Sequence, residues 1–120
     1  MRLQDILSIT RAHPITAGPD LECQVRSGFA SDLMSDVLRY DVAQGLLVTG
    51  LANPQVVRTA EMADISAILL VRGKSPPPET MELARQVGIP IMGTEMIMFE
   101  TCGRLFAAGL PACGRRNGHS

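Results

Sequence analysis

The hydrophobic positions of the chain follow a helical period first and then change to short continuous runs. Near the start, core-type residues recur three and four positions apart, which is the spacing of one face of an α-helix. These residues are Leu3, Ile6, Leu7 and Thr10. The pattern predicts a helix over residues 3–12, ended by His13-Pro14 because the residue before a proline disfavours helical backbone angles.

A different pattern follows in residues 15–30, which are interrupted by Gly18-Pro19 and Gly28. Within this segment Leu21, Cys23 and Val25 alternate with polar residues. Strict alternation is typical of a strand with one face in contact with water. We therefore expect a strand here, at or near the edge of a sheet.

From residue 31 onward, helices and buried strands are predicted in turn. Apolar runs at 45–50, 65–71 and 89–92 predict three buried strands. Helices are expected from Ser31 as N-cap, after Asn53-Pro54, over 79–87 with Gly88 as its stop, and after Thr94 as N-cap. The predicted inward residues of the first and last of these helices are Leu33, Met34, Val37, Leu38, Met98, Cys102, Leu105 and Phe106.

Apolar strands that alternate with helices are typical of a parallel sheet covered by helices. The fold class predicted is therefore α/β, a mostly parallel sheet flanked by helices, in a single domain over residues 1–111. Residues 112–120 show no periodicity and contain two glycines, so a disordered tail is predicted there.

Composition excludes several classes of protein. Hydrophobic residues make up 46% of the 120 and charged residues 19%, which indicates a folded chain. The net charge is −1, or −3 without the two positive charges of Arg115 and Arg116, so no nucleic-acid partner is expected. No apolar run is long enough to cross a bilayer, and the first residues lack a secretion signal, so we expect a cytoplasmic protein without membrane contact.

The cysteines and histidines predict no metal site. Cys23, Cys102 and Cys113 have no paired spacing, and the two histidines lie outside any ligand pattern. No cofactor is predicted either. Cys102 lies on the apolar face of a predicted helix, where a buried free thiol is expected.

Candidate ligand-binding residues cluster where the predicted strands end. In open parallel sheets, ligands bind beyond the carboxyl ends of the strands, near helix N-termini. Glycines there allow close approach to the backbone, and basic side chains supply positive charge. The residues are Thr49, Gly50, Asn53, Arg72, Gly73, Lys74 and Thr94. They predict a site for a small anion such as a nucleotide phosphate, with ordinary turn and cap chemistry as the alternative.

Two catalytic interpretations find little support in the sequence. Gly73-Lys74-Ser75 resembles the end of a phosphate-binding loop, but Ile68 stands where that motif requires a glycine. Asp32 and Asp36 lie one helical turn apart in the predicted helix and could act as an acid–base pair, although neither has an evident partner. We therefore expect no enzymatic activity, with catalysis by these carboxylates as the weaker alternative.

Two stretches resemble a known family. Residues 28–38, GFASDLMSDVL, and 47–61, LVTGLANPQVVRTAE, look like the stand-alone DRTGG-domain proteins of anaerobic bacteria. The shorter segments LVRGK, GIP and MFETCG at 70–74, 88–90 and 98–103 fit the same pattern. The resemblance spans about residues 3–110. The DRTGG string itself is absent, and Asn53-Pro54 stands where many relatives carry an acidic–basic pair.

The resemblance implies an α/β regulatory or assembly module that is often dimeric and is not a catalytic unit. Such domains occur beside CBS domains, in phosphotransacetylases, and in a form similar to the N-terminal domain of HPr kinase/phosphorylase. Stand-alone members occur near genes of iron-only hydrogenases, which implies a link to redox regulation. The resemblance carries over no catalytic residue.

These lines lead to one main hypothesis, a non-catalytic regulatory domain that acts as a homodimer and contacts a protein partner of unknown identity. Phe29, Ser31 and Asp32 are the predicted interface residues. Phe29 precedes the Ser31 cap and could anchor a dimer contact or pack onto its own helix. The alternative hypothesis is a sensor that binds a nucleotide or another anion at the carboxyl edge of the sheet.

Overall fold

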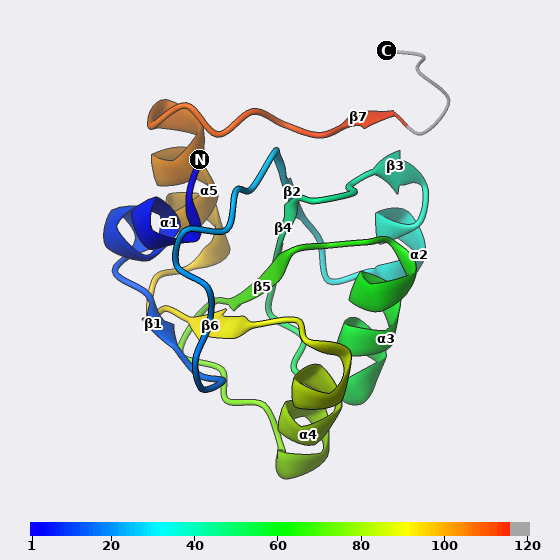
Figure 1. Cartoon of the computed structure of the whole chain (residues 1–120). Coiled ribbons are helices and arrows are strands. Elements are labelled where there is room, and N and C mark those ends of the chain that lie inside the picture. Colours follow the sequence, from blue (N-terminus) through cyan, green and yellow to red (C-terminus); the bar gives the residue numbers. More distant parts are fainter. Residues whose placement is uncertain (116–120) are drawn as a thin grey trace.

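A five-stranded sheet lies between two layers of helices (Figure 1). The structure is a computed structural model that describes residues 1–115. In chain order its elements are α1 (Leu3–Thr10), β1 (His13–Pro14), β2 (Gly28–Ala30), α2 (Met34–Val37), β3 (Tyr40–Asp41), β4 (Leu46–Thr49), α3 (Pro54–Met62), β5 (Ala67–Leu70), α4 (Pro78–Val87), β6 (Ile91–Gly93), α5 (Met98–Ala107) and β7 (Gly114–Arg115).

The sheet is mostly parallel, as the sequence predicted. Its strand order is β1-β6-β5-β4-β2, and β2, β4, β5 and β6 run parallel to one another. Only β1, at one edge, is antiparallel to its neighbour β6. The fold class is therefore a single α/β domain, and the carboxyl ends of the parallel strands lie along one edge.

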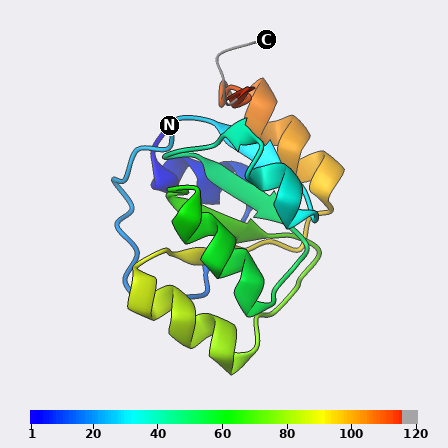
Figure 2. The same ribbon diagram turned by 90° about the vertical axis from the view of Figure 1, so that its right-hand side faces the viewer.

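The sheet separates two hydrophobic clusters because successive strand residues point to opposite faces. Leu47 and Ile68 belong to the cluster under α2, α3 and α4, whereas Leu46 and Leu69 belong to the cluster under α1 and α5. Figures 1 and 2 show the same division, with α2, α3 and α4 on the face turned toward the viewer in Figure 2. Burial on both faces explains why these strands are continuous apolar runs.

Local signals placed two helix ends correctly. The side chain of Asn53 accepts a hydrogen bond from the Val56 N–H at 3.3 Å, which caps α3 as predicted. Gly88 adopts φ 77° and ends α4. That left-handed conformation is one that glycine adopts without steric cost.

The strand expected around residues 21–26 does not form. This segment instead lies against the start of α1, where the carbonyls of Cys23 and Leu21 accept hydrogen bonds from the N–H groups of Leu3 and Gln4. The first N–H groups of a helix have no acceptor within the helix, and the carbonyls of this segment are their acceptors. The edge strand is instead β2, which begins at Gly28. The sequence had marked this glycine as an interruption.

Two predicted N-caps are wrong. α2 is a single turn that begins at Met34, and the Ser31 hydroxyl accepts a hydrogen bond from Leu33 in a local turn before it. Leu33 is consequently exposed, not part of an inward stripe. Thr94 is buried, and its hydroxyl donates to the Thr10 carbonyl at 2.7 Å, while α5 begins only at Met98.

The C-terminal segment is ordered further than predicted. The Gly28 N–H donates to the Pro111 carbonyl, and the Cys113 N–H donates to the Gly28 carbonyl, so this segment lines the outer edge of β2. β7 then pairs antiparallel with β3. The rest of the predicted tail, residues 116–120, lies outside the described residues. None of the helices within residues 1–115 has the length and hydrophobicity needed to cross a lipid bilayer.

Candidate functional site

The carboxyl edge of β4 is held by a carboxylate from the preceding loop. Asp32 Oδ1 accepts a hydrogen bond from the Thr49 hydroxyl at 3.0 Å and another from the Gly50 N–H at 2.7 Å. The Thr49 oxygen in turn accepts the Leu51 N–H at 3.1 Å. Thr49 and Gly50 are therefore built into the loop, and Asp32 acts here as a structural acceptor.

Arg72, two residues beyond the end of β5, lies beside this loop. Its φ of 59° is left-handed, and its N–H donates to the Met96 carbonyl at 2.9 Å. The guanidinium occupies the place that a Cβ on Gly50 would take, with Cζ 3.2 Å from that position. Gly50 thus permits a close approach of the Arg72 side chain, whereas the sequence predicted that a bound ligand would approach the backbone here.

The next two residues use their backbone N–H groups within the protein. The Gly73 N–H donates to the Thr94 carbonyl, and the Lys74 N–H donates to the Val71 carbonyl. The carboxylate of Glu95 lies over Gly73, with Oε2 2.6 Å from the place of a Cβ. A bound anion at this loop would therefore meet the side chains of Arg72 and Lys74 and not a cradle of backbone N–H groups.

Both side chains are exposed, and within residues 1–115 neither has an ion-pair partner. A hollow of about 350 Å³ lies next to Lys74. Its lining includes three of the predicted residues and several that the sequence did not indicate; these are His13, Ile15, Gly73, Lys74, Ser75, Pro76, Met81, Gly93, Thr94 and Glu95.

Three of the seven predicted ligand residues line this hollow, and the other four do not. Gly73, Lys74 and Thr94 line the hollow, although the Thr94 hydroxyl is engaged with Thr10. Thr49, Gly50, Asn53 and Arg72 do not line it. Asn53 serves as the cap of α3, and Thr49 serves the Asp32 loop.

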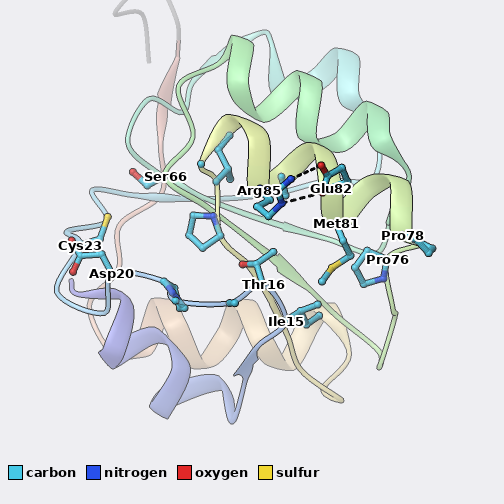
Figure 3. Close-up of a pocket in the computed structure, with 17 residues that line it drawn as sticks. Ile15, Thr16, Asp20, Cys23, Ser66, Pro76, Pro78, Met81, Glu82 and Arg85 are labelled. Carbon is cyan, nitrogen blue, oxygen red and sulfur yellow. Dashed lines mark hydrogen bonds and ion pairs between the residues drawn. The ribbon is translucent and has the colours of Figure 1, made fainter.

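A larger hollow of about 960 Å³ lies between α4 and the loop after β1 (Figure 3). It adjoins the smaller one, since Ile15, Pro76 and Met81 line both. In Figure 3, Ile15 and Thr16 face Met81 across it, and the Glu82–Arg85 ion pair stands on the α4 side. A hydrogen bond from Arg85 holds the pKa of Glu82 below its usual range. No sequence pattern predicts this hollow, because its shape depends on the path of residues 15–20.

A third hollow, of about 550 Å³, is an apolar groove between α5 and β2. Phe99 and Phe106 lie on its α5 side and are 86% and 69% exposed. On the opposite side Phe29 stacks on Tyr40, with ring centroids 5.0 Å apart. Leu105 is buried as predicted, together with Thr101, but Phe106 is exposed and does not point inward as the sequence predicts.

Two of the three cysteines, Cys102 and Cys113, also line this groove. They are half-buried, and burial raises the pKa of both thiols. The thiols are therefore held in their neutral, less nucleophilic form. Cys102 packs against the hydrophobic cluster, as expected, while remaining partly exposed.

Of the three predicted interface residues, Phe29 lines the apolar groove and the other two do not. Phe29 is half-buried, packs against the core and lines the apolar groove. Ser31 and Asp32 belong to the turn before α2, and neither lines the groove. The sequence missed Phe99 and Phe106, whose exposure can be recognised only once the inward face of α5 is known.

The described residues contain no group of three or more His, Cys, Asp or Glu side chains that could hold a metal ion. Asp32 and Asp36 line none of the three hollows. The Asp32 carboxylate accepts hydrogen bonds from the Thr49 hydroxyl and the Gly50 N–H. The arrangement offers charge and an apolar surface, and it does not bring the two carboxylates to a cavity.

No protein-family model matches the chain, and no curated protein matches it. Among solved structures, the chain is similar to the CBS and DRTGG domains of the regulatory region of a Clostridium perfringens pyrophosphatase complexed with its activator, diadenosine tetraphosphate. The TM-score is 0.68 at 16% sequence identity, and the match covers 97% of this chain and 51% of that one. The chain therefore spans about half the length of that structure. The likeness supports the DRTGG-like fold that the sequence predicted.

Proposed function

We propose that this chain is a regulatory domain of the DRTGG type that does no chemistry itself and acts by self-association as a homodimer. The observation that carries the proposal is the exposure of Phe99 and Phe106 on one face of α5, at the side of an apolar groove. Neighbouring exposed apolar side chains of this size are typical of protein interfaces. The similar structure is itself a regulatory region, which agrees with a regulatory role.

The test is the molar mass in solution, measured by light scattering over a range of protein concentrations. We expect the wild-type chain to have twice the 12.9 kDa mass of a single copy. Phe99→Ser should shift the protein to a monomer, because the substitution removes a large apolar contact at the interface. Met62→Ser is the matched control, since Met62 is 68% exposed on α3, a different helix. A wild-type mass that stays monomeric at every concentration would contradict the proposal.

A second candidate function is supported by the two free cations at the carboxyl edge. Arg72 and Lys74 are exposed there without an ion pair in the described part of the chain, beside a hollow of about 350 Å³. We propose that this edge binds the phosphate groups of a nucleotide or a similar anion. Diadenosine tetraphosphate is a suitable probe because the similar regulatory region is complexed with it.

A thermal-shift series with diadenosine tetraphosphate and with inorganic triphosphate tests this candidate. A ligand at about 100 times its dissociation constant stabilises the folded state by about 2.7 kcal/mol. Lys74→Ala and Arg72→Ala should reduce the shift. The control Arg58→Ala removes an exposed cation from α3 and should leave the shift unchanged. Equal shifts in all four proteins, or none at millimolar ligand, would exclude binding at this edge.

The link to redox or hydrogenase regulation, the cytoplasmic location and the protein partner remain predictions from the sequence. A pull-down from the native cell tests them together. Recovery of a hydrogenase or of another redox protein by the wild-type chain, and its loss with Phe99→Ser, would support the link. Recovery that is equal in both variants would place the partner contact outside the apolar groove.

A further inference from the structure

We propose that two copies of the chain pair through α5, with the two helices antiparallel and crossing beside Gly103. This inference rests on the homodimer proposed above and specifies its geometry. α5 runs along the margin of the molecule in Figure 2. The surface concerned consists of Phe99, Gly103 and Phe106, referred to below as the α5 stripe.

The α5 stripe has the composition of a helix–helix contact. Its residues are spaced by four and three positions, so they lie along one side of the helix. Both phenylalanines are mostly exposed, and a Cβ added to Gly103 would meet nothing within 4 Å. Two large rings with an open glycine between them allow another helix to approach closely at Gly103. No other exposed apolar pair of this kind occurs on one helix of residues 1–115.

The positions of the two rings favour an antiparallel pair of identical helices. Phe99 and Phe106 lie equally far on either side of the point between Cys102 and Gly103. A two-fold axis through that point would place Phe99 of each copy opposite Phe106 of the other. An interface between identical surfaces must be self-complementary in this way.

Charge complementarity also favours the antiparallel arrangement of the two helices. Glu100 and Arg104 form an exposed ion pair at 2.9 Å along one flank of the α5 stripe. In an antiparallel pair the same flank of each helix faces its counterpart, so Glu100 meets the partner's Arg104 and Arg104 meets the partner's Glu100. In a parallel pair this flank would face the opposite flank, where Leu105 turns into its own core. Antiparallel pairing therefore gains two attractive contacts that parallel pairing lacks.

The groove beside the α5 stripe provides the remaining contact surface. Its far wall is formed by β2, Tyr40 and the segment 110–113. A buried phenylalanine contributes about 150–250 Å². Phe99 and Phe106 are 86% and 69% exposed, so the four rings of two copies can supply roughly 470–780 Å² of the 1,200 Å² or more that a stable interface buries. The groove walls of both copies would supply the rest, which makes a second copy a suitable occupant.

A charge-exchange experiment tests this geometry on the full chain. Glu100→Arg places an arginine opposite the partner's Arg104 at both ends of the contact, and Arg104→Glu does the same with two carboxylates. Each should weaken dimerisation about tenfold or more. The double variant Glu100→Arg, Arg104→Glu restores opposite charges and should recover the wild-type dissociation constant. The matched control is Glu82→Arg, which breaks an exposed ion pair on α4 and should leave dimerisation unchanged.

A second variant tests the close approach at Gly103. Gly103→Gln adds a long side chain to a helix position that is open in the single chain, so the fold should be retained. Dimerisation should weaken by about tenfold or more, while the thermal unfolding curve at monomeric concentrations should move to slightly higher temperature, because glutamine is a better helix former than glycine. Dissociation constants that are the same in wild type, Glu100→Arg and Gly103→Gln would overturn the α5 geometry while leaving the homodimer intact. A monomeric wild type would overturn both.

Discussion

The guanidinium of Arg72 lies on the backbone of Gly50, at the place where any other residue would carry its Cβ. Arg72 follows β5 and Gly50 follows β4, so the contact joins the carboxyl ends of two neighbouring parallel strands. The close approach keeps a positive charge at this edge. A side chain at position 50 would displace the guanidinium of Arg72, which we propose to contact anions.

The first prediction concerns the backbone at Arg72. Its φ of 59° is unfavourable for a long side chain such as that of arginine, so Arg72→Gly should raise the free energy of unfolding by up to about 1 kcal/mol. The same variant should lose the thermal response to anions. Asp64→Gly is the control: Asp64 also has a left-handed φ of 58°, but aspartate tolerates this conformation, so the gain should be smaller and the response to anions should not change. An anion response that survives Arg72→Gly would exclude Arg72 from the site.

The second prediction concerns Asp32, which accepts hydrogen bonds from Thr49 and Gly50. Asp32→Ala leaves the buried hydroxyl and N–H without their acceptor. We expect the free energy of unfolding to fall by about 1–3 kcal/mol, measured by urea denaturation. Asp36→Ala provides the comparison and should cost less, because its carboxylate makes no hydrogen bond among the described residues. Equal losses in the two variants would show that the Asp32 contacts add little.

The third prediction concerns Thr80 on α4, whose buried hydroxyl has no hydrogen-bond partner in residues 1–115. Thr80→Val keeps the shape and removes the unsatisfied oxygen, so it should stabilise the chain by about 1 kcal/mol or more. Thr101→Val on α5 should instead destabilise it by about 1 kcal/mol, because that hydroxyl donates to the Ile97 carbonyl at 2.9 Å. The prediction fails if both variants unfold at lower temperature than the wild type.

The fourth prediction is a pH dependence at the start of α1. Hydrogen bonds from the side chain and the N–H of Arg2 lower the pKa of Asp5. As the pH falls, the unfolded chain therefore binds the proton before the folded chain does. The stability that Asp5 contributes is complete above the unfolded pKa of about 4 and is lost as the pH falls through the folded pKa.

The measurement for this prediction is the difference in unfolding free energy between the wild type and Asp5→Asn, followed from about pH 5 to pH 2. The advantage of the wild type should shrink across this window. Glu61→Gln, which removes an exposed carboxylate from α3, serves as the control. A difference that stays constant down to pH 2 would mean that the Arg2 contacts do not act on the ionised form of Asp5.

The sequence predicts the centre of this fold well, because its signals are local. β4 and β5 are buried on both faces and appear as uninterrupted apolar runs, and Asn53-Pro54 is a cap that acts within one helical turn. Each of these features can be recognised within a few residues. The order β4, α3, β5, α4, β6, α5 therefore follows from the pattern alone.

The failures concern partners that are distant in the sequence. The Thr94 hydroxyl bonds to the carbonyl of Thr10, 84 residues away, so a residue that looks like a cap serves another purpose. The apolar groove exists because β2 lies near α5, an arrangement that no local pattern contains. The position of Phe106 on the exposed side of α5 likewise depends on which face the sheet covers.

If the α5 stripe joins two copies of the chain, the Glu100→Arg, Arg104→Glu double variant must dimerise with the dissociation constant of the wild type. Sedimentation equilibrium should give dimers of wild-type strength for the double variant and much weaker dimers for each single variant. If the double variant dissociates as readily as the worse of the two single variants, the charges do not meet across the contact, and the antiparallel arrangement of α5 is contradicted.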